Sequence, residues 1–131
     1  MRYAVGPSVV RGCGVAAVVL FCGGFLAAAA KADEAGFEPL FDGKSLAGWK
    51  VNENPQSWKV EGGEIVCHGP RSHLFFVGGD AAKPAEYKNF HFKADVLTKP
   101  GANSGIFFHT KFQPDGWPAV GYEMQVNNSQ G

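Results

Sequence analysis

The sequence is poor in cysteine and carries no excess of charge of either sign. Its 131 residues contain three cysteines, and Cys13 and Cys22 both fall in the apolar N-terminal region. Cys67 stands alone in the remainder of the chain, which excludes an internal disulfide there. Lysine plus arginine equals aspartate plus glutamate at 12 each, with no basic stripe. This balance argues against a nucleic-acid partner.

The sequence also lacks helical periodicity. No segment convincingly repeats the i, i+3, i+4 apolar spacing of an amphipathic helix, and no internal repeat or low-complexity tract follows the N-terminal region. Short apolar runs instead alternate with turns, and the chain contains 18 glycines. This pattern is typical of an antiparallel β-sandwich or barrel, and the length suits one domain.

Residues 1–32 are predicted to be a signal peptide. A basic start precedes the uncharged apolar run 14–30, and AKA at residues 30–32 fits a small-residue cleavage site. The run is at the short end of the roughly 20 apolar residues that a membrane span needs. We therefore expect secretion or a periplasmic location, without stable membrane insertion after cleavage. An uncleaved anchor is one alternative, and a lipoprotein at Cys22 is another, disfavoured by the bulky Phe21 before it.

The predicted mature domain, residues 33–131, is mildly acidic. Without the signal peptide, nine basic residues face twelve acidic ones, a net charge of −3. Cys67 is interpreted as a small buried apolar residue. A nucleophilic role is disfavoured because the neighbouring base, His68, would point to the opposite face of a strand.

Four short runs predict the early strands. An edge strand interrupted by Pro39 is expected at residues 37–41. Gly62-Gly63 between two alternating runs predicts a two-residue hairpin. The runs that predict strands are residues 37–41, 58–60, 65–67 and 73–77.

The late strands alternate most clearly, at residues 90–98, 105–110 and 121–126. A period of two places alternate residues on opposite faces of a sheet. The set expected to face the core is Phe90, Phe92, Ala94, Val96, Ile106, Phe108, Tyr122, Met124 and Val126. The set expected on the opposite face is His91, Lys93, Asp95, Phe107, His109, Glu123 and Gln125. An ordinary solvated face explains this second set equally well.

Glu123 and Gln125 favour a binding role for this face. They place a carboxylate and an amide on adjacent same-side positions, which suits hydrogen bonding to sugar hydroxyls. The aromatic residues Phe107, Trp117 and Tyr122 are near in sequence or pattern. Aromatic faces beside such groups suit the apolar faces of sugar rings.

Four motifs occur in an order that resembles the family of 3-keto-disaccharide hydrolases, also described as 3-keto-glucoside lyase/hydratase domains. They are FEPLFDGKSLAGWK (37–50), WKVEGGEIVCHG (58–69), FHFKADVLTKPGANSGIFFHT (90–110) and GYEMQVNN (121–128). The resemblance spans residues 37 to 128. It implies an all-β fold, a concanavalin A-like jelly-roll β-sandwich with a concave carbohydrate site.

The resemblance also implies a chemistry and a substrate. The expected reaction is cleavage of 3-keto-glycosides by C2 proton abstraction, elimination at C1 and hydration, with net hydrolysis. Relatives continue past Gly131 for several strands, so we expect this sandwich to be incomplete at the C-terminus. We also expect the chain as given to be marginally stable and inactive, although the complete protein would act.

The resemblance assigns roles to several positions. Glu123 matches the family's Glu-x-Gln and is the candidate base. His109 stands where relatives carry arginine, so it can polarise a ketone or shuttle a proton but cannot form a bidentate clamp. The predicted catalytic residues are Glu123 and His109, and the predicted substrate-binding residues are Gln125, Asn103, Lys93 and Tyr122.

Several alternatives stay open at this stage. Asn103 and Ser104 are alternatively interpreted as purely structural turn residues. Lys93 is alternatively interpreted as a solvated strand residue without a binding role. No cofactor is predicted, with a divalent metal held by Asp95, His109 and Glu123 as the alternative. The competing functions are a non-catalytic lectin-like carbohydrate-binding module and a structural interaction domain.

Overall fold

The computed structural model describes residues 2–3, 36–80 and 82–129. Apart from Arg2 and Tyr3, the predicted signal peptide lies outside these residues. The described part contains no α-helix and one short 3-10 helix. The elements are β1 (Arg2–Tyr3), β2 (Trp49–Val51), η1 (Pro55–Ser57), β3 (Trp58–Glu61), β4 (Glu64–Cys67), β5 (Leu74–Phe76), β6 (Ala102–Phe108) and β7 (Tyr122–Asn128).

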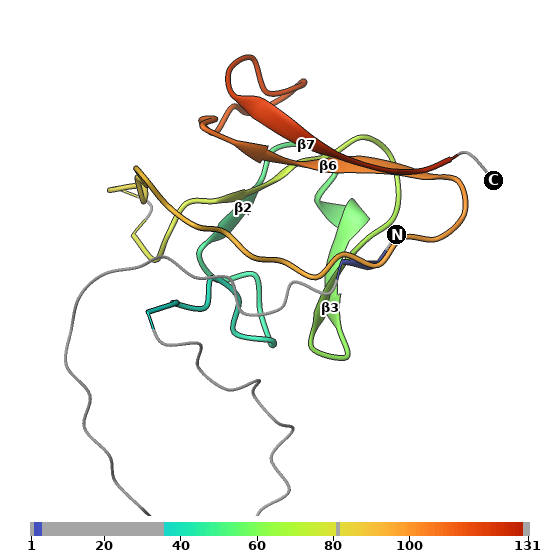
Figure 1. Cartoon of the computed structure of the whole chain (residues 1–131), viewed down its shortest axis with the longest axis horizontal. Helices are drawn as coiled ribbons and strands as arrows, with labels where there is room; N and C mark the ends of the chain where they lie inside the picture. Colours follow the sequence, from blue (N-terminus) through green and yellow to red (C-terminus); the bar gives the residue numbers. More distant parts are fainter. Residues whose placement is uncertain (1, 4–35, 81, 130–131) are drawn as a thin grey trace, which may run out of the picture.

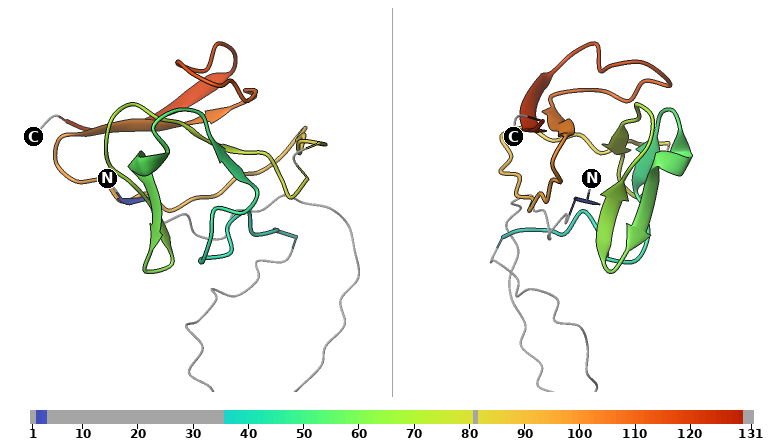
Figure 2. Two further views of the ribbon diagram at one scale, coloured as in Figure 1. Left: turned by 180° about the vertical axis from the view of Figure 1, so that it is seen from behind. Right: turned by 90° about the vertical axis from the view of Figure 1, so that its right-hand side faces the viewer.

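The strands form three small antiparallel sheets, ordered β1-β4-β3, β2-β5 and β6-β7. They lie in two layers: β2–β5 and β3–β4 make one layer, and β6–β7 with the preceding connection makes the other (Figures 1 and 2). The predicted all-β class is confirmed, and the two layers form a jelly-roll-like β-sandwich. Within the described residues, no helix has the length and apolarity that crossing a bilayer requires.

The β3–β4 hairpin forms where the Gly-Gly pair predicts it. Glu61 pairs with Glu64, so the loop contains only Gly62 and Gly63. Their φ angles are +62° and +81°, a left-handed conformation that glycine adopts without a side-chain penalty. This geometry matches the twist of the flanking strands, which is why the pair specifies the register.

The core is small and lies beside this hairpin. The buried apolar side chains of the described residues are Phe41, Ile65, Val66 and Phe75. Cys67 is half-buried, and burial raises the pKa of its thiol. A raised thiol pKa disfavours the nucleophilic thiolate, while the expected burial of Cys67 is only partial.

The expected edge strand at residues 37–41 is absent. Pro39 has no N–H to donate to a ladder, and the chain turns directly afterwards. The Asp42 carboxylate accepts hydrogen bonds from the backbone N–H groups of Lys44 (2.8 Å) and Ser45 (2.7 Å). These bonds, with one from the Ser45 hydroxyl, lower the pKa of Asp42. The segment is therefore a side-chain-stabilised turn.

The other predicted strands are confirmed in part. Residues 90–98 alternate between half-buried and exposed as expected, but only Leu97 has a bridge partner there. The expected strand at 105–110 begins earlier, at Ala102, and ends at Phe108. His109 follows with φ +55°, so its backbone has left the extended conformation and the period-two rule no longer places its side chain.

Candidate functional site

One face of the β6–β7 hairpin carries the predicted carboxylate and amide. Directly opposed residues of an antiparallel pair project to the same side. The register pairs Phe107 with Glu123 and Gly105 with Gln125, and Asn103 with Asn127. These six residues are called the polar face below. The expectation that Phe107, Glu123 and Gln125 lie on one face is therefore confirmed, and Asn103, interpreted from the sequence as a turn residue, lies on the same face.

The polar face is exposed except at Gly105 and Phe107, which are half-buried, and it has internal hydrogen bonds. The Gln125 amide donates to the Asn103 side-chain oxygen (2.5 Å) and to the Ser104 carbonyl (3.0 Å). Glu123 lies across Gly105, because a Cβ added at residue 105 would be 2.6 Å from the Glu123 Cγ. The missing side chain at 105 thus leaves the space that the carboxylate occupies.

The other face of the hairpin was expected to pack in the core, but three of its large apolar side chains are exposed. The exposed fractions of Tyr122 and Met124 are 67% and 52%, and that of Phe108 is 38%. The ring of Phe107, on the polar face, instead packs at 5.9 Å from the ring of His73 next to β5. The polar face therefore looks toward the β2–β5 layer. Tyr122, predicted to bind substrate, lies on the face opposite Glu123.

His109 does not share the polar face. Its ring lies 5.7 Å from the rings of both Phe90 and Phe108. Phe108 pairs with Tyr122 and belongs to the face opposite Glu123. The predicted grouping of His109 with Glu123 is wrong, because the left-handed residue turns the chain out of the strand at that point.

Lys93 lies in a separate aromatic environment. Its Nζ is 4.4 Å from the centroid of the Phe37 ring, and that ring also packs at 5.3 Å from His91. The contact is a cation–π interaction of the kind that lysine stems form along aromatic surfaces. The structure therefore places Lys93 on Phe37, and its predicted role in substrate binding stays a prediction.

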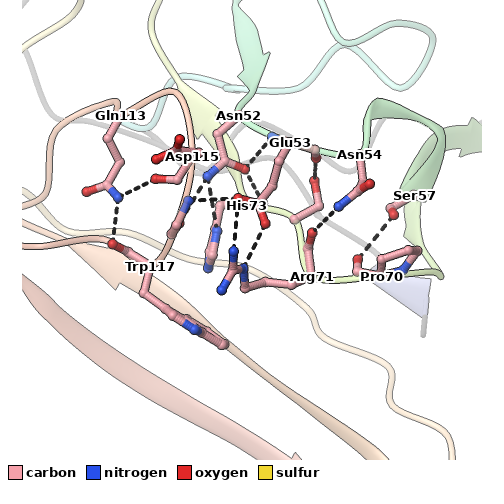
Figure 3. Close-up of polar contacts among 12 residues, drawn as sticks. Asn52, Glu53, Asn54, Ser57, Pro70, Arg71, His73, Gln113, Asp115 and Trp117 are labelled. Carbon is pink, nitrogen blue, oxygen red and sulfur yellow. Dashed lines mark hydrogen bonds and ion pairs between the residues drawn. The ribbon is translucent and has the colours of Figure 1, made fainter.

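Sequence reasoning missed a polar cluster that contains Asn52, Glu53, Arg71 and His73, and joins them to Trp117 (Figure 3). Arg71 forms a forked ion pair with Glu53, with Nε–Oε1 at 2.7 Å and Nη2–Oε2 at 3.4 Å. The Gly116 N–H donates to the same carboxylate at 2.7 Å. The Arg71 bond, then the Gly116 bond, lower the pKa of Glu53, and Glu53 in turn raises the pKa of Arg71.

Asn52 ties this cluster to the β2–β5 sheet. Its side-chain oxygen accepts from the backbone N–H groups of Glu53 (2.7 Å) and His73 (2.8 Å). Its amide nitrogen donates to the Gly116 carbonyl at 3.2 Å and lies 3.4 Å from His73 Nδ1. An acceptor role for Nδ1 leaves the proton of the neutral ring on Nε2. Asn52, Glu53 and Arg71 together are called the Glu53 clamp below.

The surroundings of His73 favour the neutral form of its imidazole. Burial is the main cause that lowers the pKa of His73, and Arg71 lowers it further, while Glu53 and Glu123 oppose the shift. The Glu123 carboxylate of the polar face is thus one of the charges near this imidazole. The β2–β5 pairing continues past the strands, where Asn52 N–H donates to the His73 carbonyl, and so brings residues 52–53 beside 71–73. No sequence pattern indicates this pairing.

Aromatic rings connect the clamp to the polar face. The His73 ring lies 5.1 Å from Trp117 and 5.9 Å from Phe107, edge to face in both cases. Trp117 is 61% exposed. A flat apolar surface beside a carboxylate, amides and a guanidinium offers both kinds of contact that a polyhydroxylated ring requires.

The metal alternative finds no assembled site. Within the described ranges, no group of three or more histidine, cysteine, aspartate or glutamate side chains lies together in a way that could hold an ion. The set considered from sequence, Asp95, His109 and Glu123, is therefore not brought together. Two surface hollows lie elsewhere, one lined by residues 82–86 and one by residues that include Phe41 and Phe76.

Comparison with known proteins gives two matches. Residues 36–131 match the family model described as a 3-keto-alpha-glucoside-1,2-lyase-like domain. A protein of Bacteroides thetaiotaomicron named 3-keto-disaccharide hydrolase is 32% identical over 81 residues, which cover 58% of this chain. The chain spans 28% of the length of that relative. No solved structure matches the chain at a significant level.

Proposed function

Since the chain belongs to the 3-keto-alpha-glucoside-1,2-lyase-like domain family, we propose that it acts on 3-keto-glycosides and hydrolyses them by elimination followed by hydration. The named relative supports the substrate class, because it is a 3-keto-disaccharide hydrolase.

We include in the proposal that residues 1–32 are a signal peptide and that the mature domain works in the periplasm or outside the cell. N-terminal sequencing of the exported protein tests this, and the expected first residue is Asp33.

The chemistry depends on the ketone at C3 of the sugar. The ketone acidifies the proton at C2, and a base removes that proton to form an enolate. The enolate electrons then form the C1–C2 double bond as the glycosidic oxygen leaves C1 and takes up a proton. Water adds across this double bond, with hydroxide at C1 and a solvent proton at C2. Such a sequence needs a general base, an acid for the leaving group and stabilisation of the enolate.

The observation that carries the proposal is the joint position of Glu123 and Gln125 on the polar face. Both are exposed on β7, and Glu123 has the space above Gly105. We assign Glu123 as the base for the C2 proton. Gln125 and Asn103, already hydrogen-bonded to each other, are assigned to the sugar hydroxyls. His109 and Tyr122 have no part in this assignment, because their side chains lie away from the polar face.

The test is turnover of 3-keto-disaccharides by the full-length protein in D2O, with products followed by NMR. Elimination and hydration place deuterium at C2 of the released 3-keto sugar, whereas direct hydrolysis at C1 leaves hydrogen there. Glu123→Gln is expected to reduce kcat by about 100-fold or more, in line with the loss of a positioned general base. Glu64→Gln, on the β3–β4 hairpin, is the matched control. Release of a sugar without C2 deuterium, or full activity of Glu123→Gln, contradicts the assignment.

A lectin-like carbohydrate-binding module is the second candidate, favoured by the exposed Trp117 indole. Under this function the chain binds sugars and turns over none of them. Glu123→Gln then has no turnover to remove, and unoxidised disaccharides bind as well as their 3-keto derivatives. Calorimetry with both sugar forms separates the two candidates.

A further inference from the structure

Trp117 combines high exposure with a backbone fixed from two sides. It lies in the long connection between β6 and β7, residues 109–121. On one side the Glu53 clamp holds its neighbour, since Gly116 donates to Glu53 at 2.7 Å and accepts from Asn52 at 3.2 Å. These partners are more than 60 positions away in the chain.

Gln113 fixes the same segment from within the connection. Its amide donates to the carbonyls of Asp115 and Trp117, both at 2.6 Å, and its oxygen accepts from the Ala119 N–H at 2.8 Å. Gly116 has φ +72°, a conformation that disfavours a side chain. The peptide units on both sides of Trp117 are thus held before any ligand arrives.

Such an arrangement has an energetic cost that folding alone does not explain. Ordering a connection of this length lowers chain entropy, and the indole stays mostly in water instead of contributing to the core. Exposed aromatic rings fixed in this way reduce the entropy lost when a ligand stacks on them. The hydrogen bonds therefore present the indole rather than bury it.

The surroundings of the indole fit a sugar. The guanidinium carbon of Arg71 lies 5.8 Å from the Trp117 ring centroid, and the Arg71 side chain is 47% exposed. His73 contacts both Trp117 and Phe107, and Phe107 is paired with Glu123. The indole and the Glu123 carboxylate are therefore neighbours of one imidazole. This juxtaposition places a stacking surface and a carboxylate on the same side of the molecule.

We propose that Trp117 is the stacking platform for the second sugar ring of the disaccharide, the ring that leaves, and that the Glu53 clamp positions it. The inference rests on the proposed function, because the 3-keto ring must present its C2 proton to Glu123. The leaving ring then extends toward the indole and stacks by its apolar face. Exposed N–H groups of Arg71 donate to its hydroxyls.

The test compares two substrates that differ in the second ring. One is a 3-keto-disaccharide prepared by C3 oxidation of maltose, and the other is methyl 3-keto-α-glucoside, which has no second ring. Trp117→Ala is expected to raise KM for the 3-keto-disaccharide about tenfold or more, the size expected for loss of an aromatic anchor. Its kcat and its KM for the methyl glycoside stay unchanged. Trp117→Phe keeps most of the affinity.

Matched controls separate stacking from general surface effects. Tyr122→Ala removes another exposed ring from the opposite face of the hairpin and is expected to change neither KM. Glu53→Gln weakens the clamp and is expected to raise KM for the 3-keto-disaccharide alone, with Glu53→Asp partly restoring it. Quenching of tryptophan fluorescence by maltose, present in the unaltered protein and lost in Trp117→Phe, tests the contact without relying on a folded alanine variant.

The outcomes distinguish this inference from the proposed function. Normal KM of Trp117→Ala for the 3-keto-disaccharide, or an equal rise for both substrates, overturns the platform while the hydrolase function stands. Sugar binding that depends on Trp117 without any turnover overturns the hydrolase function and leaves a platform in a binding module. Absence of both sugar binding and turnover overturns both.

Discussion

Single residues decide the geometry of the polar face. Gly105 lies beneath the Glu123 carboxylate, and Phe107 turns this face toward His73. Neither effect is visible from charge or hydropathy alone. Strand parity predicts that residues 105, 107, 123 and 125 share a side, but the absence of a side chain at 105 is what lets Glu123 lie flat.

Gly105→Ala is expected to displace the Glu123 side chain. The added Cβ would lie 2.6 Å from the Glu123 Cγ and 2.7 Å from its carboxyl carbon. Because that side chain is flexible, the stability loss is expected to stay below about 1 kcal/mol. Turnover of a 3-keto-disaccharide is expected to fall about 100-fold, the size of effect that a small misplacement produces. Gly79→Ala, whose Cβ meets nothing within 4 Å, is the control, and unchanged turnover of Gly105→Ala contradicts this placement.

His73 is expected to make stability depend on pH below neutrality. Its pKa in the folded protein is lowered from 6.5, first by burial, so the unfolded chain binds more protons between the lowered pKa and pH 6.5. Stability therefore rises with pH through this window and is lost as the pH falls below 6.5. The groups facing the ring are Arg71, which strengthens the shift, and Glu53 and Glu123, which oppose it.

Urea unfolding between pH 5.0 and 7.5 measures this dependence. His73→Gln is expected to flatten the curve, since it removes the group whose pKa changes on folding. His68→Gln, at an exposed position, is the matched control substitution. A curve of the His73→Gln variant as steep as that of the unaltered protein excludes His73 as the source.

At the scale of elements, local turn chemistry explains the β3–β4 hairpin. Gly62 and Gly63 both have positive φ, and a Cβ at Gly62 would meet nothing within 4 Å. Any cost of a side chain there therefore comes from the backbone alone. The hairpin contributes Ile65 and Val66 to the core, so its turn affects the whole layer.

Gly62→Ala is expected to destabilise the domain by about 1–2 kcal/mol, the cost of a left-handed conformation for an L-residue. Gly62→Asn is expected to be close to neutral, because Asn-Gly is a preferred pair for this turn. Denaturant midpoints of the two variants provide the measurement. If the Gly62→Ala and Gly62→Asn variants unfold at the same denaturant midpoint, residue 62 does not adopt a left-handed backbone conformation in solution.

The β6–β7 hairpin shows where element-level reasoning stops. Alternation correctly groups Glu123 with Gln125, because it depends only on the period of the strand. It wrongly directs Tyr122 and Met124 to the core, since the choice between two faces depends on what packs against them. It also wrongly extends β6 to His109, where a left-handed backbone ends the alternation.

At the scale of the whole molecule, the apolar surface is large compared with the core. Four buried apolar side chains contrast with six exposed large ones among the described residues. The exposed ones are Leu97, Phe108, Trp117, Val120, Tyr122 and Met124. Little of the apolar surface is thus removed from water, which limits the main stabilising contribution to folding.

Residues 33–131 alone are therefore expected to be marginally stable. A circular-dichroism melt should show a broad transition at or below the usual mesophile range of about 45–65 °C. A dye that binds exposed apolar surface should fluoresce with the native chain. A sharp, cooperative transition well above that range, without dye binding, is inconsistent with the exposed apolar surface described.

The sequence by itself determined the all-β class, the Gly62-Gly63 turn and the common side of Glu123 and Gln125. These depend on strand period and on local backbone preferences, which neighbouring residues specify. Only the tertiary structure decided that the polar face looks toward β5, that His109 leaves it, and that the Glu53 clamp holds the segment of Trp117. The clamp joins Gly116 to residues more than 60 positions away, and the contact between Phe107 and His73 joins two separate sheets. No local pattern records which surfaces meet in this way, and the strand period does not reveal the left-handed backbone of His109.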